Sequence, residues 1–364
     1  MEDLVNLWKG RRVFITGHTG FKGGWLSLWL AGRGAQIRGY SLDPATRPSL
    51  FKVAAVADVL EDRRGDTRDY PRLKTSLIEF VPEVVFHLAA QPILRRSYSD
   101  PLGTYGTNVM GTANLFEAVR QSPSVRAVVC ITSDKCYQNH EWAWPYRESD
   151  PLGGHDPYSS SKACAEIVAA AWRDSYFPVN RMSEHRVAIA TARAGNVIGG
   201  GDWSEDRLIP DLVRGFESEN PVLIRHPQAI RPWQHVLEPL QGYIILAEHL
   251  LAGHAHAASA FNFGPGEEDA CTVEHIADRA VSIWGPGARW VHDDAPSVHE
   301  AHYLKLDSSQ ARSELGWRPR LNLETALEWT LQWYRKCKSG ADMAAETRSQ
   351  IAAYQKLAIP VATA

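Results

Sequence analysis

Short apolar runs alternate with amphipathic stretches along the first half of the chain. The apolar runs at 12–16, 36–42, 84–89, 126–132 and 186–192 have the length of strands buried on both faces. Between them, 108–120 and 158–172 carry apolar residues at helical spacing, and another helix follows the turn at 17–23. This alternation predicts an α/β fold with a Rossmann-like, doubly wound parallel sheet.

The pattern loosens after about residue 195, where proline, glycine and tryptophan are frequent. We expect residues 1–193 to form the sheet domain, with 233–260 packing back on it. Residues 194–364 are then mainly a smaller, mixed C-terminal lobe that binds the substrate, ending in a helix at 340–357. We interpret that last helix as a surface or interface helix.

Composition narrows the class of protein. Of 364 residues, 44% are apolar and 22% charged, which is typical of a globular protein, and the net charge of −3 argues against a nucleic-acid binder. The best candidate for a membrane span, 242–261, contains Glu248 and three histidines, so we expect no membrane association. The acidic start of the chain also lacks the basic-then-apolar order of an export signal.

Cysteine and histidine spacing add two expectations. The five cysteines are scattered without a C-x-x-C pair, which predicts reduced thiols and a cytoplasmic location. The fourteen histidines include no H-x-x-x-H pair, so we assign no metal.

A glycine-rich turn follows the first predicted strand. Gly17, Gly20 and Gly23 form the spacing G-x-x-G-x-x-G, and a helix begins directly after them. Such a turn brings backbone N–H groups and a helix N-terminus against a pyrophosphate. The turn therefore predicts a dinucleotide site formed by Gly17, Thr19, Gly20, Phe21, Lys22 and Gly23.

The end of the second strand bears on the choice between NAD and NADP. Ser41 falls where an acid usually binds the adenosine ribose of NAD, and Asp43 comes two positions later. NAD is favoured, while Arg38 and Arg47 keep NADP open. Asp66 either edges the adenine pocket or belongs to a capping turn.

Three polar residues predict proton-transfer chemistry. Tyr158 and Lys162 lie four positions apart, on one face of a predicted helix. An ammonium at that distance is expected to lower the pKa of the phenol, which could then act as a base. Ser133, at the end of an earlier strand, can hydrogen-bond the same substrate hydroxyl. The order of glycine turn, Ser133, Tyr158 and Lys162 is far more specific than any one of them.

These residues resemble the extended short-chain dehydrogenase/reductase family, and within it the nucleotide-sugar 4,6-dehydratases, along nearly the whole chain. Relatives that act on dTDP-glucose have T-D-E at the strand end, where this chain has Ser133-Asp134-Lys135. That substitution, and the segments 8–14 and 230–236, are similar to the branch that acts on CDP-glucose. The resemblance implies NAD as the cofactor, a nucleotide-sugar substrate, a homodimer or homotetramer, and a role in deoxysugar biosynthesis such as that of lipopolysaccharide O-antigen.

The implied reaction assigns a role to each catalytic residue. Tyr158 takes the proton of the glucose 4-OH while hydride leaves C4, and the ketone so formed acidifies the C5 proton. Lys135 is the candidate base at C5, which requires a depressed pKa, and Asp134 is the acid at the 6-OH if burial keeps it protonated. Return of hydride to C6 then completes a dehydration without net use of cofactor.

The resemblance also implies further binding residues. Leu88, Ala89 and Ala90 match a segment that lies along the cofactor, and Asn108 matches a structural asparagine of the central helix. Asn196 matches a residue that touches the sugar nucleotide. For the diphosphate, Arg231 is the best candidate, ahead of Arg207 and Arg193. His235, His302 and Tyr303 either line the pocket or pack in the core.

Two alternatives stay open at this point. One is another enzyme on the same scaffold, either an epimerase or a dehydratase for a dTDP- or GDP-sugar, although an epimerase needs no acid–base pair such as Asp134 and Lys135. The other is a non-catalytic nucleotide-binding relative, in which loss of the tyrosine or the lysine is typical. This chain keeps both.

Overall fold

A seven-stranded sheet forms the centre of the molecule in the computed structural model, which describes residues 7–266, 269–293 and 303–358. All strand pairs in it are parallel, and the spatial order is β11-β6-β5-β4-β1-β2-β3. The strands are β1 (Arg12–Thr16), β2 (Gln36–Ser41), β3 (Glu61–Arg64), β4 (Val84–His87), β5 (Ala127–Ile131), β6 (Ala188–Ala194) and β11 (Ala260–Phe263).

The strands are buried on both faces because their successive side chains enter two different cores. On β1, Val13 and Ile15 join the larger core, whereas Phe14 between them joins the smaller one. Helices α2 (Phe21–Gly32) and α11 (Leu237–Leu251) supply the larger core, and α4 (Tyr70–Phe80), α7 (Gly111–Arg120) and α8 (Pro157–Ser175) supply the smaller one. The predicted doubly wound sheet is therefore confirmed.

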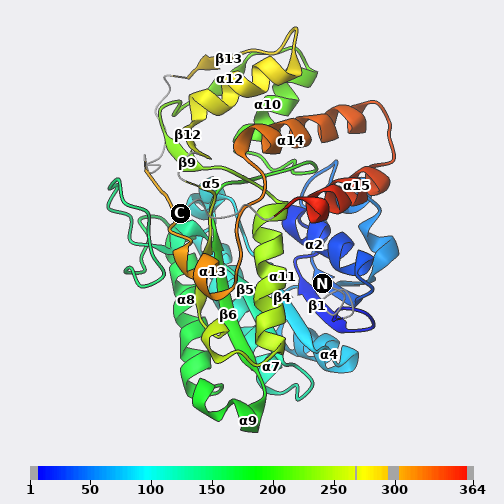
Figure 1. The fold of residues 1–364 in the computed structure, drawn as a ribbon, viewed down its shortest axis with the longest axis vertical. Helices are drawn as coiled ribbons and strands as arrows, with labels where there is room; N and C mark the ends of the chain where they lie inside the picture. The colour runs from blue at the N-terminus through cyan, green and yellow to red at the C-terminus, as the bar shows by residue number, and fades with distance from the viewer. Residues whose placement is uncertain (1–6, 267–268, 294–302, 359–364) are drawn as a thin grey trace.

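A second lobe stands beyond the C-terminal ends of the strands (Figure 1). It contains three helices and two-stranded pairs rather than an extension of the sheet. The helices are α10 (Leu208–Glu217), α12 (Val273–Trp284) and α14 (Leu323–Lys338). The strand pairs are β7 (Val197–Ile198) with β10 (Gln234–His235), β8 (Val222–Ile224) with β13 (Trp290–His292), and β9 (Ile230–Pro232) with β12 (Ala270–Thr272).

The lobe and the sheet domain share elements. After β10, α11 returns to pack on β5 and β6, and β11 adds the edge strand beside β6. The division at residue 193 stays a prediction. The described residues also contain five short helices: α3 (Leu50–Val53), α5 (Leu94–Ser99), α6 (Pro101–Tyr105), α9 (Met182–His185) and α13 (Ser309–Glu314).

Several predicted elements differ from the observed ones by a few residues, and two of these differences have a clear structural cause. The run at 84–89 ends as a strand at His87, because the chain then leaves the sheet beside the glycine turn. The helix expected at 108–120 begins earlier, since α6 passes into α7 through a π-helical turn at Gly106–Met110.

The last helix, α15 (Met343–Lys356), packs one face on α2 and α14 and exposes the other. Its Tyr354 ring meets Trp29 edge-on, with ring centroids 5.6 Å apart. This agrees with a surface helix. Among the described residues, no helix combines the length and the hydropathy needed to cross a bilayer.

Candidate active site

The glycine turn lies at the C-terminal end of β1, between the sheet and α2. Gly17 has a φ of +78°, and a Cβ there would lie 2.7 Å from the backbone nitrogen of Ala89. A Cβ at position 23 would lie 2.2 Å from the Gly17 carbonyl oxygen. Both positions therefore require glycine, and the turn stays narrow enough for backbone N–H groups to face a ligand.

The turn has the features that a dinucleotide diphosphate needs. It leads into the N-terminus of α2, where Gly20 is the N-cap residue and no acidic side chain occupies the first turn. Thr19 fixes the turn to the neighbouring strand, because its hydroxyl lies 2.8 Å from that of Ser41 and donates to the Leu42 carbonyl at 3.0 Å. The residues present thus fit the diphosphate of NAD.

The side chains near the expected adenosine end are mostly engaged with one another. Arg38 is held by Glu61 in a two-pronged ion pair at 2.9 and 3.0 Å, which leaves it poorly placed for a 2′-phosphate. Asp43 is exposed. Asp66 lies just beyond β3 and pairs with Arg68, which lowers the pKa of its carboxyl. The adenine role of Asp66 stays a prediction.

Asn108 links the cofactor segment to the catalytic helix. Its buried carboxamide accepts from the Gln91 N–H at 2.8 Å and donates to the Gln91 carbonyl and to the Ser161 hydroxyl, at 3.1 and 2.8 Å. Gln91 directly follows Leu88, Ala89 and Ala90, and Ser161 is on α8. Asn108 thus sets the distance between the chain after β4 and the helix that carries Tyr158.

The predicted catalytic residues come together at the C-terminal end of β5. Ser133 caps a single 3₁₀ turn at Asp134–Cys136: its hydroxyl accepts from the Lys135 N–H at 3.1 Å and donates to the Asp134 carboxyl at 2.9 Å. Tyr158 and Lys162 point from the buried face of α8, and the Lys162 ammonium donates to the Ile131 carbonyl at 3.3 Å. Two elements far apart in sequence therefore build one cluster.

The expected direction of the Tyr158 pKa is wrong. Burial raises the pKa of the phenol, and the interactions with the Ser133 hydroxyl and the Arg207 charge only partly offset that rise. Burial, and not the charge of Lys162, has the largest effect on the pKa of the phenol. Burial also lowers the pKa of the Lys162 ammonium itself. Sequence spacing predicted the neighbourhood of these groups but not the loss of water around them.

Asp134 has the character expected of a general acid. Burial raises the pKa of its carboxyl, against the opposing effects of Lys135, Ser133 and Arg231. Its Oδ2 atom is buried and without a hydrogen-bond partner, so it remains available to a bound molecule. A Cβ at Gly195 would approach that oxygen to 3.0 Å, and the glycine therefore leaves room for it.

Glu166 anchors the catalytic helix and had no signal in the sequence. Located on α8 one turn beyond Lys162, it accepts hydrogen bonds from Thr132 on one side and from Thr191 and Arg193 on the other, the last two at 2.7 and 2.8 Å. Although burial opposes ionisation, Arg193 and the hydroxyls keep the pKa of Glu166 below its usual value. Arg193, considered for the diphosphate from sequence, is thus committed to α8 and the sheet.

Two further cations face the cluster. Lys22, from the first turn of α2, lies among Arg207, Lys162 and Asp134, and burial and the first two charges lower its pKa to about 7. Arg207, at the start of α10, also pairs with Asp202 at 3.7 Å. The sequence assigned Lys22 to the cofactor turn but did not predict its approach to Asp134.

The other residues predicted to bind the substrate differ in how near they lie to this cluster. Arg231 is buried on β9, and its charge acts on Asp134. Asn196 lies between β6 and β7 and accepts the Gln234 N–H through its carbonyl at 3.0 Å. Tyr303 forms an isolated β-bridge with Ile230.

His235 packs between Trp25 and Trp329 in the core, and burial lowers its pKa to about 3. His302 lies outside the described residues.

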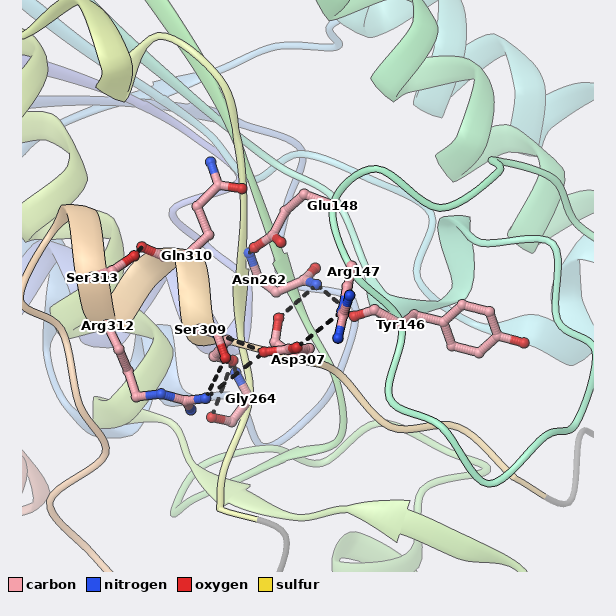
Figure 2. A network of polar contacts seen from close by, with 11 residues as sticks. Tyr146, Arg147, Glu148, Asn262, Gly264, Asp307, Ser309, Gln310, Arg312 and Ser313 are labelled. Carbon is pink, nitrogen blue, oxygen red and sulfur yellow. Dashed lines mark hydrogen bonds and ion pairs between the residues drawn. The ribbon is translucent and has the colours of Figure 1, made fainter. Parts of the chain in front are cut away.

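A polar network holds the chain that follows Lys135 (Figure 2). The Asn262 amide of β11 donates to the Tyr146 carbonyl at 2.9 Å and to the Asp307 carbonyl at 3.0 Å, while its backbone N–H donates to Glu148 at 2.7 Å. Arg147 also pairs with the Asp307 carboxylate at 3.3 Å. The segment beyond the catalytic turn is therefore fixed to the sheet edge and to the chain returning from the lobe.

Comparison with known proteins agrees with this geometry. The family model described as GDP-mannose 4,6 dehydratase matches residues 14–330, so the chain belongs to that family of extended short-chain dehydrogenases/reductases. The predicted resemblance is confirmed.

Individual relatives narrow the comparison. A CDP-glucose 4,6-dehydratase from Salmonella typhimurium strain LT2 is 54% identical over 96% of this chain and 97% of its own length. A UDP-glucose 4-epimerase from Mycolicibacterium smegmatis is 27% identical over 89% of this chain and 98% of its own. The solved structure of MoeE5 in complex with UDP-glucose and NAD has a TM-score of 0.75 and 25% identity, covering 90% of this chain and 99% of that one.

Proposed function

We propose that the chain is an NAD-dependent lyase that converts CDP-glucose into CDP-4-keto-6-deoxyglucose. The observation that carries this proposal is the buried, unpartnered Asp134 oxygen beside Lys135 and near Tyr158. The identity of 54% to a CDP-glucose 4,6-dehydratase supports both the reaction and the substrate.

NAD, when bound at the glycine turn, supplies the redox chemistry by taking hydride from C4 and giving hydride to C6. The protein's own groups manage the protons. Tyr158 accepts the 4-OH proton, a role that is favoured by any positive charge that lowers the pKa of the phenol. The Arg207 charge and the Ser133 hydroxyl both act on the phenol in that direction.

The elimination uses the 3₁₀ turn after β5. Lys135 takes the C5 proton, and Asp134 donates its proton to the 6-OH, which leaves as water with the electrons of the C–O bond. Burial raises the pKa of Asp134, which favours the protonated form that this step needs. Arg231 and Arg207 are the proposed cations for the substrate diphosphate, and Asn196 and Tyr303 the proposed contacts to the sugar nucleotide.

Substrate comparison tests the proposal. The purified protein is incubated with NAD and CDP-glucose, dTDP-glucose or UDP-glucose, and the 4-keto product is followed by its absorbance in alkali. We expect product with CDP-glucose at a rate at least tenfold above the other two. Preference for dTDP-glucose would favour a dehydratase of another specificity. Formation of a 4-epimer without the chromophore would favour an epimerase. No turnover of any substrate would favour a non-catalytic relative.

The chain also offers support for self-association and a cytoplasmic setting. Leu102, Met110 and Ile167 are 84%, 56% and 57% exposed on the helices near 101–110 and on α8, where apolar side chains of this size favour burial against a second copy. We expect a homodimer or homotetramer, and a lower mass by light scattering for Ile167→Glu.

Five free cysteines favour a reducing compartment. The expected product suits deoxysugar synthesis for O-antigen.

A further inference from the structure

Three histidines meet at the end of the sheet away from the catalytic turn. His249 is on the last turn of α11, and His254 and His256 follow in the connection to β11. Catalytic residues come after the C-terminal ends of the strands, whereas this connection precedes β11 and lies toward the opposite end of the sheet (Figure 1). The active site does not use these side chains.

The imidazole groups are close enough to share one ion. The Nδ1 atoms of His249 and His254 are 3.1 Å apart, and one ring nitrogen from each of the three residues lies within 4.8 Å of the others. Ligand nitrogens around a tetrahedral zinc, at about 2.05 Å from the ion, are separated by roughly 3.4 Å. Small side-chain rotations therefore suffice to bring the three nitrogens onto one ion.

The backbone builds this arrangement rather than leaving it to chance rotamers. Gly253 adopts a φ of +77°, which turns the chain sharply after α11, and the His254 N–H then donates to the His249 carbonyl at 3.1 Å. The Ala257 N–H donates to the His254 carbonyl at 3.1 Å, which closes the next turn and places His256 beside His254. The rings of His254 and His256 are stacked, with centroids 5.5 Å apart.

We propose that His249, His254 and His256 form a site for a divalent transition-metal ion of the zinc or nickel class. Imidazole is the ligand type that these ions prefer, and three such ligands leave a fourth position open to solvent because His254 and His256 are exposed. The C-terminal end of α11 adds a favourable field for a cation. The bound ion joins α11 to the start of edge strand β11, so its effect is on stability.

The test uses full-length protein without an affinity tag, since a histidine tag would bind the same ions. Calorimetric titration with zinc or nickel chloride is expected to show one tight site in the parent protein. The double variant His254→Ala/His256→Ala should bind at least about tenfold more weakly, because two ligands are lost. The matched control, His275→Ala, changes a single exposed histidine on α12 and should bind as the parent does.

Two further readouts separate a built site from weak surface binding. Cobalt(II) should give visible ligand-field absorption with the parent and the control but not with the double variant. Zinc should raise the melting temperature of the parent and of the control, but not that of the double variant. Dehydratase activity of the double variant should equal that of the parent and reports correct folding. Equal zinc and cobalt binding by parent and double variant, or no binding by either, would overturn the proposal.

Discussion

Glu238 is a buried carboxyl whose ionisation should make the stability of the protein depend on pH. It lies in the first turn of α11 and has no exposed surface. Its Oε1 accepts from the Arg320 and Leu321 N–H groups at 2.9 and 2.7 Å, and its Oε2 accepts from the Tyr354 hydroxyl at 2.7 Å. Despite these donors, burial raises the pKa of Glu238 from 4.5 to about 7.

The sign follows from comparing the folded and unfolded states. Below pH 4.5 the carboxyl is protonated in both states, so the full stabilisation is present. As the pH rises towards 7, the unfolded chain loses this proton first, and unfolding becomes easier. At 1.36 kcal/mol per pH unit, the difference between the two pKa values corresponds to about 3 kcal/mol lost by pH 8.

Glu238→Gln removes this charge while keeping the shape and the Oε1 acceptor. We expect the variant to be more stable than the parent at pH 8, by up to about 3 kcal/mol, and nearly equal to it at pH 5. The measurement is urea unfolding at pH 5, 6, 7 and 8, with Glu217→Gln, an exposed glutamate at the end of α10, as control. Parallel pH profiles for the parent and Glu238→Gln would refute the reasoning.

Three predictions concern catalysis. Tyr158→Phe should lower turnover at least about a thousandfold while NAD binding, measured by fluorescence titration, stays intact; near-normal turnover would contradict the proton-transfer role. Lys135→Ala should still let hydride leave C4, detected as transient absorbance at 340 nm, but block water loss, and dehydration at the parental rate would exclude Lys135 as the C5 base. Gly195→Ala should slow dehydration at least about tenfold, because its Cβ would lie 3.0 Å from the Asp134 oxygen and 2.7 Å from Pro232 Cγ; an unchanged rate would show that this oxygen does not need the space.

The catalytic cluster could be predicted because its parts are local patterns. Tyr158 and Lys162 share a helix face at a spacing that any helix enforces, and Ser133 ends a strand that is apolar enough to be recognised. The parallel sheet was predictable for the same reason, whereas its strand order was not predicted. The glycine turn predicted a dinucleotide site because it lies between a strand and a helix; the glycine spacing by itself would not have done so.

Other features depend on packing that no local pattern encodes. Glu166 is one of two acids on an amphipathic helix, and only the fold brings Thr132, Thr191 and Arg193 to it. The raised pKa of Tyr158 results from burial by residues distant in sequence. The three histidines escaped a search for helical ligand spacing because a turn at Gly253, not a helix, brings them together.

The hydrogen bonds of Glu166 bear on which parts of the protein can change in evolution without loss of the reaction. Because Glu166 ties α8 to Thr132 after β5 and to Thr191 of β6, the phenol and the ammonium that α8 carries are held next to the Asp134 turn. The residues proposed to meet the nucleotide, Arg207, Arg231 and Tyr303, come instead from the lobe beyond residue 195. A new sugar nucleotide could therefore be accommodated by exchanging lobe segments, with the reaction chemistry inherited unchanged.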